Sequence, residues 1–403
     1  MYLREVNIFN FLKPFIIQGI AVTAGFFFHL AVVRILGSYE AGIFFASFSI
    51  YAIFSMTSLF GQQKGLISRR YFDNGGDFRW IFSYIILSWI LVLFIWIIFF
   101  SEISFRYVFN ALFAAFVASI GIFYQSKRWF FTSSIFQQYG INILAILFLI
   151  FFSSIQNADQ LAKYFTIAAI FLILASLLFG KIPFKNITRE KEDNFNQFGI
   201  VLIPFWLISV FSSSFDYLPI YISSIVTQPV FTASFAVIIK VVALCSFSLV
   251  AINRFSLVEY AKKSNDLDFL HRASRRYGFY AFIVSVPIFI LLLLFPGKIL
   301  LFFSQDFTGD ANILRWCLIP HLFNLLTGQS TALLMVTGNV NIVLRNQIIS
   351  AIVLLLFSLL AIYSGDIMFV ILSFIIPPSL NNSLNFFSVY KILNILSFPK
   401  LIN

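Results

Sequence analysis

Two long apolar runs lie near the middle of this chain, Ile200–Ile222 and Val230–Ile252. Each is long enough to cross a bilayer as a helix, because a span needs about 20 apolar residues. Each also carries one ionisable residue well inside it, Asp216 in the first run and Lys240 in the second. An ionisable side chain at the centre of a bilayer costs roughly 2.5–3.5 kcal/mol on insertion scales. The two runs therefore predict a pair of membrane-spanning helices whose charged residues need a partner or a water-filled cavity.

Helix geometry allows these two charges to meet. If the first run leaves the cytoplasm and the second returns, Asp216 lies about 9 Å and Lys240 about 15 Å below the outer ends of their helices, at about 1.5 Å per residue. The lysine stem is long enough to cover that difference. Two interpretations follow. The residues form a structural ion pair between adjacent helices, or Lys240 faces an aqueous cavity and binds an anionic ligand.

The rest of the chain repeats this apolar pattern. Of the 403 residues, 60% are hydrophobic and 11% are charged, and the mean hydropathy is +0.94. A soluble domain carries about 25% charged residues. We therefore expect an all-α polytopic membrane protein. The sequence contains twelve candidate spans, at residues 14–36, 42–63, 80–100, 106–125, 133–153, 162–179, 200–222, 230–252, 277–296, 312–336, 341–363 and 367–390.

The distribution of positive charge predicts the orientation of these spans. Cytoplasmic loops of membrane proteins carry an excess of Lys and Arg. With the N-terminus inside, 21 of the 27 Lys and Arg residues fall in inner segments and five in outer segments, and Lys240 remains within a span. This asymmetry predicts that both termini are cytoplasmic. It also accounts for the net charge of +11 without any nucleic-acid partner.

A polar segment of mixed charge, Lys181–Gly199, falls between the sixth and seventh spans and is interpreted as a cytoplasmic linker. It divides the chain into an N-terminal six-helix lobe, residues 1–180, and a C-terminal six-helix lobe, residues 200–403. When the chain is shifted by 190 residues, Leu12–Phe15 aligns with Leu202–Phe205. This match favours two lobes related as repeats, with an axis along the membrane normal.

Two further segments carry local expectations. Arg254–Arg276 is predicted either as an amphipathic helix on the inner membrane surface or as a solvated loop. The pair Pro377-Pro378 predicts a kink or break in the last span, because each proline removes a backbone donor.

The sequence contains no enzymatic constellation. The three histidines, His29, His271 and His321, are scattered and form no HExxH motif, and there is no Walker-type glycine loop. Cys245 and Cys317 each lie in an apolar run and do not form a disulfide or metal framework. We therefore predict no enzyme, no cofactor and no metal, and a process driven by an ion gradient rather than by a nucleotide.

Several stretches resemble polysaccharide transporters. The sequence RILGSYEAGIFFASFSI at Arg34–Ile50 is similar to their first outer turn and second helix, and Phe211–Val242 is similar to their seventh and eighth helices, including Asp216. The stretches NDLDFLHRASRRY and LLMVTGNVNIVLRNQIISAIVLLLF resemble the loop before their ninth helix and their tenth and eleventh helices. In this order, over nearly the whole chain, the sequence resembles the Wzx-type O-antigen and exopolysaccharide flippases. These belong to the MOP superfamily, which includes the multidrug and toxin extrusion (MATE) transporters.

The resemblance implies a MATE-like fold of two six-helix lobes around a central cavity, working by alternating access in a bacterial inner membrane. It implies that an oligosaccharide on undecaprenyl diphosphate moves from the inner to the outer leaflet. Its further implied partners are the lipid bilayer, H⁺ or Na⁺ as the coupling ion, and a polysaccharide polymerase.

The ionisable residues within or beside the spans are mostly basic, which suits a diphosphate or an acidic sugar. For the arginines near helix ends, snorkelling to the membrane surface is the competing interpretation. For the histidines, the competing interpretation is a hydrogen-bonded packing role. The candidate residues are Lys240, Arg34, Arg315 and Arg345 for substrate binding, and Asp216, His321 and His29 for ion coupling.

Three other functions stay open at this point. A MATE-type drug or cation antiporter would want buried acids, and only Asp216 qualifies. A lipid II flippase usually has two further helices, which this chain lacks. A membrane polysaccharide polymerase or ligase carries a large outer loop for catalysis, and every predicted outer loop here is short.

Overall fold

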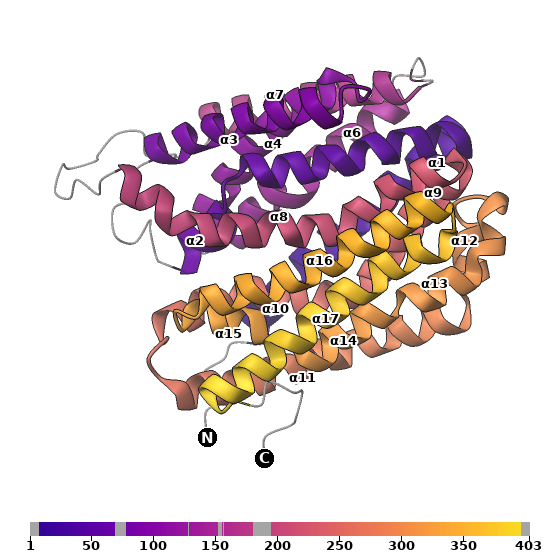
Figure 1. The fold of residues 1–403 in the computed structure, drawn as a ribbon. Coiled ribbons are helices and arrows are strands. Elements are labelled where there is room, and N and C mark those ends of the chain that lie inside the picture. Colours follow the sequence, from indigo (N-terminus) through magenta and orange to yellow (C-terminus); the bar gives the residue numbers. More distant parts are fainter. Residues whose placement is uncertain are drawn as a thin grey trace.

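The computed structural model describes residues 8–68, 78–127, 129–151, 155, 157–179 and 195–395. Every regular element among these residues is a helix, and the helices run roughly parallel to one axis (Figure 1). The all-α class predicted from composition is therefore confirmed.

The first element, α1 (Ile8–Ser58), is a hairpin of two helical arms rather than one long helix. Gly37 has φ 79° and ψ 163°, a backbone conformation that is open to glycine and strained for other residues. The rings of Phe28 and Phe48 lie 6.1 Å apart, whereas a straight helix would separate these residues by about 30 Å. The chain therefore reverses at Gly37, and α1 supplies the first and second spans.

The rest of the N-terminal half consists of α2 (Gln62–Ser68), α3 (Phe78–Phe99), α4 (Phe105–Ser126), α5 (Phe130–Ser134), the π-helical turn η3 (Ile135–Tyr139), α6 (Gly140–Phe151) and α7 (Ala158–Phe179). The C-terminal half consists of α8 (Phe195–Val226), α9 (Pro229–Val242), the 3₁₀ turn η4 (Ala243–Ser246), α10 (Phe247–Lys262), α11 (Leu267–Leu294), α12 (Pro296–Leu301), the 3₁₀ turn η5 (Gln305–Asp310), α13 (Ala311–Cys317), α14 (Ile319–Thr327), α15 (Ser330–Val336), α16 (Val340–Ser364) and α17 (Ile367–Leu393).

The predicted spans correspond to these helices. Within the described residues, nine helices are long and apolar enough to cross a membrane, and a pair bent by 62°, Phe131–Gln137 with Gly140–Phe151, forms another. That count takes α1 as a single helix, but its two arms form two spans, so α1 adds one more. The tenth predicted span is divided among α13, α14 and α15, with a break at Gly328, where φ is 64°. Each of the twelve candidate spans is thus helical over its described residues.

The helices lie in layers. The N-terminal helices α3, α4, α6 and α7 lie on one side and α10, α11 and α14 to α17 on the other, with α1, α8 and α9 between them (Figure 1). Within the middle layer α1 packs against both α8 and α9. Residues 180–194 lie outside the described residues, so the linker at 181–199 and the boundaries of lobes 1–180 and 200–403 remain predictions.

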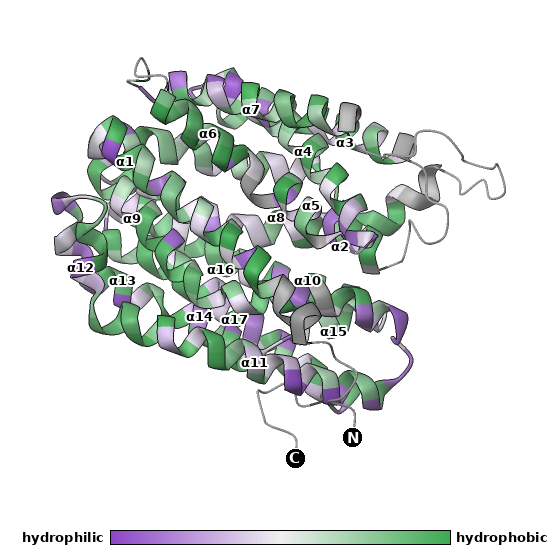
Figure 2. Ribbon diagram, turned by 180° about the vertical axis from the view of Figure 1, so that it is seen from behind, coloured by the Kyte–Doolittle hydropathy of each residue, from purple (hydrophilic) through white to green (hydrophobic). Residues whose placement is uncertain are grey.

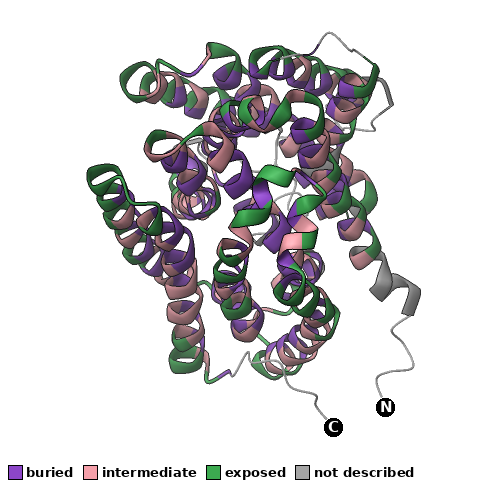
Figure 3. Ribbon diagram, turned by 90° about the vertical axis from the view of Figure 1, so that its right-hand side faces the viewer, coloured by how far each residue is buried: buried purple, intermediate pink, exposed green. Residues whose placement is uncertain are grey.

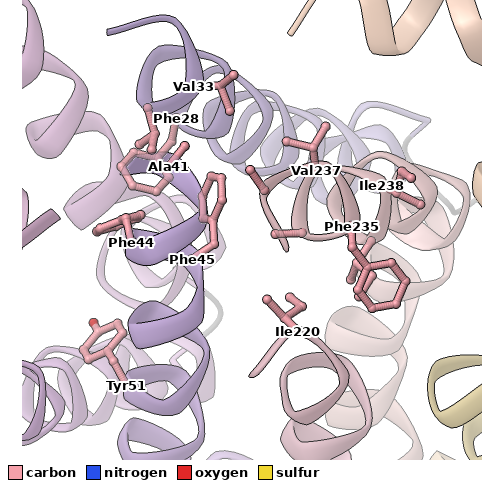
Figure 4. Packing of buried hydrophobic residues seen from close by; sticks show 14 of the residues in the cluster. Phe28, Val33, Ala41, Phe44, Phe45, Tyr51, Ile220, Phe235, Val237 and Ile238 are labelled. Atoms are coloured by element: carbon pink, nitrogen blue, oxygen red, sulfur yellow. The ribbon is translucent and has the colours of Figure 1, made fainter. Parts of the chain in front are cut away.

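The largest apolar core lies where α1 meets α9. The rings of Phe28 and Phe44 are fully buried on α1, and Val237 and Phe235 belong to the same core from α9 (Figure 4). The Phe235 ring points away from α1 and meets Phe374 of α17 at 6.3 Å. Phe28 and Phe44 meet edge to face at 6.0 Å, a favoured aromatic geometry. The high phenylalanine content therefore serves packing in this core.

The outer faces of the helices are apolar as well. Exposed residues line the perimeter of the molecule (Figure 3), and on α16 they include Ile352, Leu355 and Leu359. Polar residues concentrate toward the two ends of the helices (Figure 2). A continuous apolar belt of this kind faces lipid in a membrane protein.

The segment Arg254–Arg276 differs from both of its predictions. α10 continues the eighth span to Lys262, and α11 begins at Leu267, so only a four-residue turn separates the two helices. The prediction of a separate surface helix or a long solvated loop is wrong. The apolar pattern of the sequence did not reveal these helices, because their ends beyond the apolar runs are polar and look like a loop.

Of the kink or break predicted at Pro377-Pro378, the break is wrong. α17 runs without interruption from Ile367 to Leu393. Ser379 Oγ donates to the carbonyl of Ile375 at 2.6 Å, so a hydroxyl bonds to the backbone beside the prolines. Neighbouring helices and hydroxyls of this kind allow proline inside a membrane helix.

The ends of the eighth span provide a test of topology. Gln228 precedes α9 and Lys263 follows α10, both exposed, at opposite ends of one continuous span, Pro229–Lys262. A cysteine at Gln228 is expected to react with an impermeant maleimide added to intact cells, and a cysteine at Lys263 to react only after permeabilisation. Labelling of Lys263→Cys in intact cells would reverse the predicted orientation. Cys245 and Cys317 are buried and contribute little background.

Candidate functional site

Lys240 lies in the last turn of α9, where the eighth span changes to a 3₁₀ turn after Val242. The half-buried ammonium donates a hydrogen bond to Tyr217 Oη at 2.9 Å and lies 4.3 Å from the centre of that ring. An ammonium has three N–H donors. No other acceptor among the described residues bonds to it, so two donors remain for water or a ligand.

Asp216 borders the same region from α8. The structure extends α8 to Val226, four residues past the predicted span, and α9 begins at Pro229. Asp216 and Lys240 therefore lie at similar depths, about 15–17 Å below the outer turn, at about 1.5 Å per residue. The prediction had placed Asp216 too close to the surface because it ended the helix early.

The two charges do not form the ion pair that was one interpretation. The Asp216 side chain is exposed and close enough to Lys240 to interact electrostatically. Across the described part of the chain, however, no hydrogen bond reaches this carboxylate and no ion pair within 4.0 Å joins it to Lys240. Lys240 instead bonds to the neighbouring phenol.

His29 joins this cluster from the first arm of α1. It is 4% exposed, and its ring stacks on Phe45 at 4.9 Å. His29 Nδ1 lies 2.8 Å from the carbonyl of Gly25, so this nitrogen carries the proton and donates it. Lys240 is close enough to interact electrostatically with the ring. The structure thus brings together His29, Asp216 and Lys240, which are far apart in the sequence.

Two tyrosines in this cluster were missed by sequence reasoning. Tyr217 holds Lys240, and the buried Tyr51, from the second arm of α1, is close enough to interact with Tyr217. The ring of Phe48 lies 5.2 Å from Tyr51 and 6.5 Å from Tyr217, and completes an aromatic wall. The chain has 16 tyrosines and no pattern among them. The position of Tyr217 beside an intramembrane carboxylate was the only available clue.

Close contacts between α1 and the C-terminal half lie on both sides of this cluster. On the side predicted to be outer, a Cβ on Gly42 would lie 1.9 Å from the carbonyl oxygen of Pro229, so the two backbones touch. On the inner side, Trp206 Nε1 donates to the carbonyl of Thr57 at 2.8 Å, and a Cβ on Gly61 would lie 2.4 Å from the Trp206 nitrogen. The cluster therefore lies between an outer and an inner contact of the two halves.

His321 belongs to a second polar group in the C-terminal half. Its Nδ1 lies 2.8 Å from Ser246 Oγ, and Asn324 also donates to that hydroxyl at 3.3 Å. The other ring nitrogen, Nε2, is buried and has no hydrogen-bond partner in the part of the chain that the structure describes. Ser246 follows Lys240 by six residues, so this group lies one and a half turns along the same span.

Arg34 lies outside the Lys240 cluster, in a contact between the two halves at the end of the bundle predicted to be outside. Its guanidinium donates to the carbonyl of Phe302, from Nη2 at 2.6 Å and from Nε at 3.1 Å. Nearby, Ser38 Oγ donates to Asp306 Oδ2 at 2.6 Å and lies 3.1 Å from Ser304 Oγ. We call these four contacts the outer clasp.

Asp306 makes the outer clasp sensitive to pH. Hydrogen bonds from Ser38 and Ser304 favour the ionised form and lower the pKa of this carboxyl below its ordinary value. A carboxyl with a lowered pKa contributes stability that is present above its ordinary value and lost as the pH falls through the folded value. The Asp306 part of the clasp is therefore intact at neutral pH and weakens only in strong acid.

The other two predicted arginines also lie apart from Lys240. Arg315, on α13, donates to Asn312 Oδ1 at 2.7 Å and to the carbonyl of Leu293 at 3.3 Å, and it is exposed. Arg345, on α16, is exposed and donates to Asn346 Oδ1 at 3.3 Å. The structure does not bring either arginine to the central cluster, and both contacts are those of interfacial side chains.

The central cluster can recognise charge but shows no catalytic arrangement. Among the described residues, no three His, Cys, Asp or Glu side chains gather in a way that could hold a metal ion. A half-free ammonium, an unbonded carboxylate and a histidine with one ring nitrogen free can together bind an anion and exchange protons.

Comparisons with known proteins identify the fold. No protein-family model matches the sequence, and no curated protein matches it significantly. The structure is similar to a multidrug resistance MATE family transporter of the MOP superfamily in an outward-facing conformation, with a TM-score of 0.66 and 13% identity over 96% of this chain and 95% of that one. It is also similar to a MATE structure in complex with MaL6, with a TM-score of 0.67 and 14% identity over 96% of both chains.

A third similar structure differs in its described binding pocket. It is a MOP superfamily transporter from Pyrococcus furiosus Vc1 (DSM3638), for which a reversed polarity of the binding pocket is said to suggest a different function. The TM-score is 0.59, with 13% identity over 96% of this chain and 94% of that one. At these identities the comparisons show that this chain has the MATE fold, with about twelve membrane helices.

Proposed function

We propose that this protein is a membrane transporter that flips an oligosaccharide linked to undecaprenyl diphosphate from the inner to the outer leaflet. An ion gradient, of protons rather than sodium, drives the transport by alternating access. The observation that carries the proposal is Lys240, whose ammonium lies deep in a span and has no carboxylate partner among the described residues.

The state of Lys240 supports an anionic substrate. Keeping an ammonium at this depth costs free energy unless protein, water or a ligand solvates it. Tyr217 uses one of its three donors. A diphosphate offers several acceptor oxygens, and hydrogen bonds between ionised partners are about twice as strong as neutral ones. The outer and inner contacts between the two halves lie on either side of this residue, as a carrier with two alternating openings requires.

The titratable neighbours support coupling to protons. His29 keeps a free ring nitrogen beside Lys240, and the Asp216 carboxylate has no hydrogen bond from a described residue. Binding of an anion at Lys240 would change the electrostatic potential at His29 and Asp216. We propose that one of them takes up or releases a proton as the substrate binds and leaves, with His321 as a further candidate along the same span.

One observation favours a second candidate, a MATE-type antiporter for drugs or other organic cations. Asp216 is exposed in the same region, and its carboxylate could bind a cation directly. The charge of the substrate distinguishes the two candidates. A cation carrier would bind its substrate through the Asp216 carboxylate, and an anion carrier through the Lys240 ammonium.

The experiment is transport by the purified full-length protein in liposomes. We expect a fluorescent oligosaccharide on undecaprenyl diphosphate to cross the bilayer when a proton gradient is present, and ethidium not to be exported. Protein-free liposomes and liposomes with both proton and sodium gradients collapsed are the controls. Export of ethidium without flipping would favour the antiporter. Flipping that survives full collapse of both gradients would contradict ion coupling.

A further inference from the structure

A groove separate from the central cluster lies between α4 and α7, at the end of the bundle that the charge distribution assigns to the outside. Both helices belong to the N-terminal layer (Figure 1). Its volume is about 380 Å³. The side chains that line it are Phe105, Arg106, Phe109, Lys163, Thr166 and Ile167.

The two walls of this groove are held in a defined register. Tyr107 Oη donates to the carbonyl of Ala158 at 3.3 Å, and Asn110 Nδ2 donates to the carbonyl of Ala162 at 2.8 Å. Thr166 Oγ1 in turn donates to Asn110 Oδ1. Three hydrogen bonds between α4 and α7 therefore set the spacing of the groove.

The aromatic side of the groove is supported from behind by α3. Trp96 packs on Phe105 at 5.4 Å, and Trp89 packs on Phe109 at 6.1 Å. Trp89 Nε1 also donates to the carbonyl of Val108 at 2.9 Å. Phe105 and Phe109 remain 47% and 38% exposed despite this support, so their free faces point out of the protein.

The groove carries two basic residues on the predicted outer side of the protein, where basic residues are few. Arg106 and Lys163 are two of only five basic residues in the predicted outer segments. Arg106 Nη1 lies 4.0 Å from Asp159 Oδ2, but both side chains are more than half exposed, and such pairs are weak. Lys163 makes no hydrogen bond or ion pair with any described residue. Counting Asp159, the rim carries one net positive charge.

The groove is charged at its outer end and apolar further in, as a phospholipid is charged at its headgroup and apolar along its acyl chains. On α4, Phe109 lies one helical turn inward from Arg106, and on α7, Ile167 lies one turn inward from Lys163. Ile167 is 41% exposed. The cations therefore stand nearer the membrane surface, and the apolar side chains stand deeper, where acyl chains begin.

We propose that this groove binds one anionic phospholipid of the outer leaflet. The phosphodiester contacts Lys163 and Arg106, and the start of an acyl chain lies over Phe109 and Ile167. One net positive charge matches the single negative charge of a phosphodiester. The site thus anchors the N-terminal helices to the outer leaflet, whatever the protein transports.

The test is retention of lipid by the purified full-length protein, counted by native mass spectrometry. Phosphatidylglycerol and phosphatidylcholine with identical acyl chains are offered together. Wild type is expected to retain one phosphatidylglycerol in preference to phosphatidylcholine. Lys163→Gln should lower that preference about fivefold, the effect expected for one basic residue at an anionic lipid surface.

Lys298→Gln is the matched control. Lys298 is also an exposed outer lysine beside an exposed phenylalanine, with its ammonium 5.5 Å from the ring of Phe295, but it lies outside the groove. Its loss should leave the preference unchanged. Ile167→Trp keeps every charge, fills the apolar part of the groove, and should also reduce retention.

Three results would overturn the proposal. Wild type could retain both lipids equally, or Lys163→Gln and Lys298→Gln could behave alike. Millimolar glycerol phosphate could displace the lipid completely, which would make the groove a site for a free phosphate rather than for a lipid.

Discussion

Replacing Lys240 by alanine is expected to abolish transport while the protein remains folded in the membrane. The ammonium lies in the cluster with Asp216 and His29, and its one hydrogen bond to a described residue is to Tyr217 Oη. Hydrogen bonds to charged groups contribute about 1.5–3 kcal/mol, so loss of these contacts should slow transport about 10- to 100-fold or more. The measurement is the rate of flipping in liposomes, together with the amount of folded protein.

Two further substitutions separate the charge from the shape of the side chain. Lys240→Arg keeps the positive charge and should retain part of the transport. Tyr217→Phe keeps the ring beside Lys240 and removes only the hydroxyl acceptor, so it should have a smaller effect than Lys240→Ala. A larger effect of Tyr217→Phe would mean that the hydroxyl, and not the ammonium, contacts the substrate.

The interpretation of Lys240 as a structural residue makes the opposite prediction. If Lys240 and Asp216 pair during the cycle, removing either one leaves an uncompensated charge within the span, which is strongly destabilising. The double variant Asp216→Ala with Lys240→Ala would then recover both protein level and transport. Recovery of transport in the double variant would remove Lys240 from the substrate site.

Locking the outer clasp is expected to stop transport completely. Ser38 Oγ and Ser304 Oγ lie 3.1 Å apart, on the α1 hairpin and on the segment after α12. Cysteines at both positions bring their sulfurs within reach of a disulfide, which requires an S–S distance of about 2.05 Å. Alternating access requires these two segments to separate. Oxidation should therefore abolish flipping, and reduction with dithiothreitol should restore it.

A second cysteine pair controls for the cross-link itself. Ser223 Oγ and Thr232 Oγ1 lie 3.3 Å apart on α8 and α9, both within the C-terminal half. A disulfide there should leave transport largely intact, because it does not join the two halves. Full transport by protein shown by mass spectrometry to carry the Ser38–Ser304 cross-link would mean that the outer clasp does not open during the cycle.

Local properties of the sequence predicted the architecture well. The length and apolar character of each run determined twelve helical spans, since the thickness of a bilayer and the need to bond every backbone group leave few alternatives. Asp216 and Lys240 were singled out because an ionisable residue in such a run is costly. Tyr217 was missed because its role depends on which way Lys240 points, and no periodicity encodes that direction.

The sequence by itself therefore determined the helical class, the spans and the charged residues at their centres, and only the tertiary structure decided which of these residues meet. The predicted set divides into His29, Asp216 and Lys240 at the centre, His321 further along the same span, and the three arginines elsewhere. Arg34 illustrates the reason. Its partner is a backbone carbonyl 268 residues away. Such a contact forms only when whole helices pack together. Every residue type has the same backbone carbonyl, so the sequence does not indicate which one will accept the hydrogen bond.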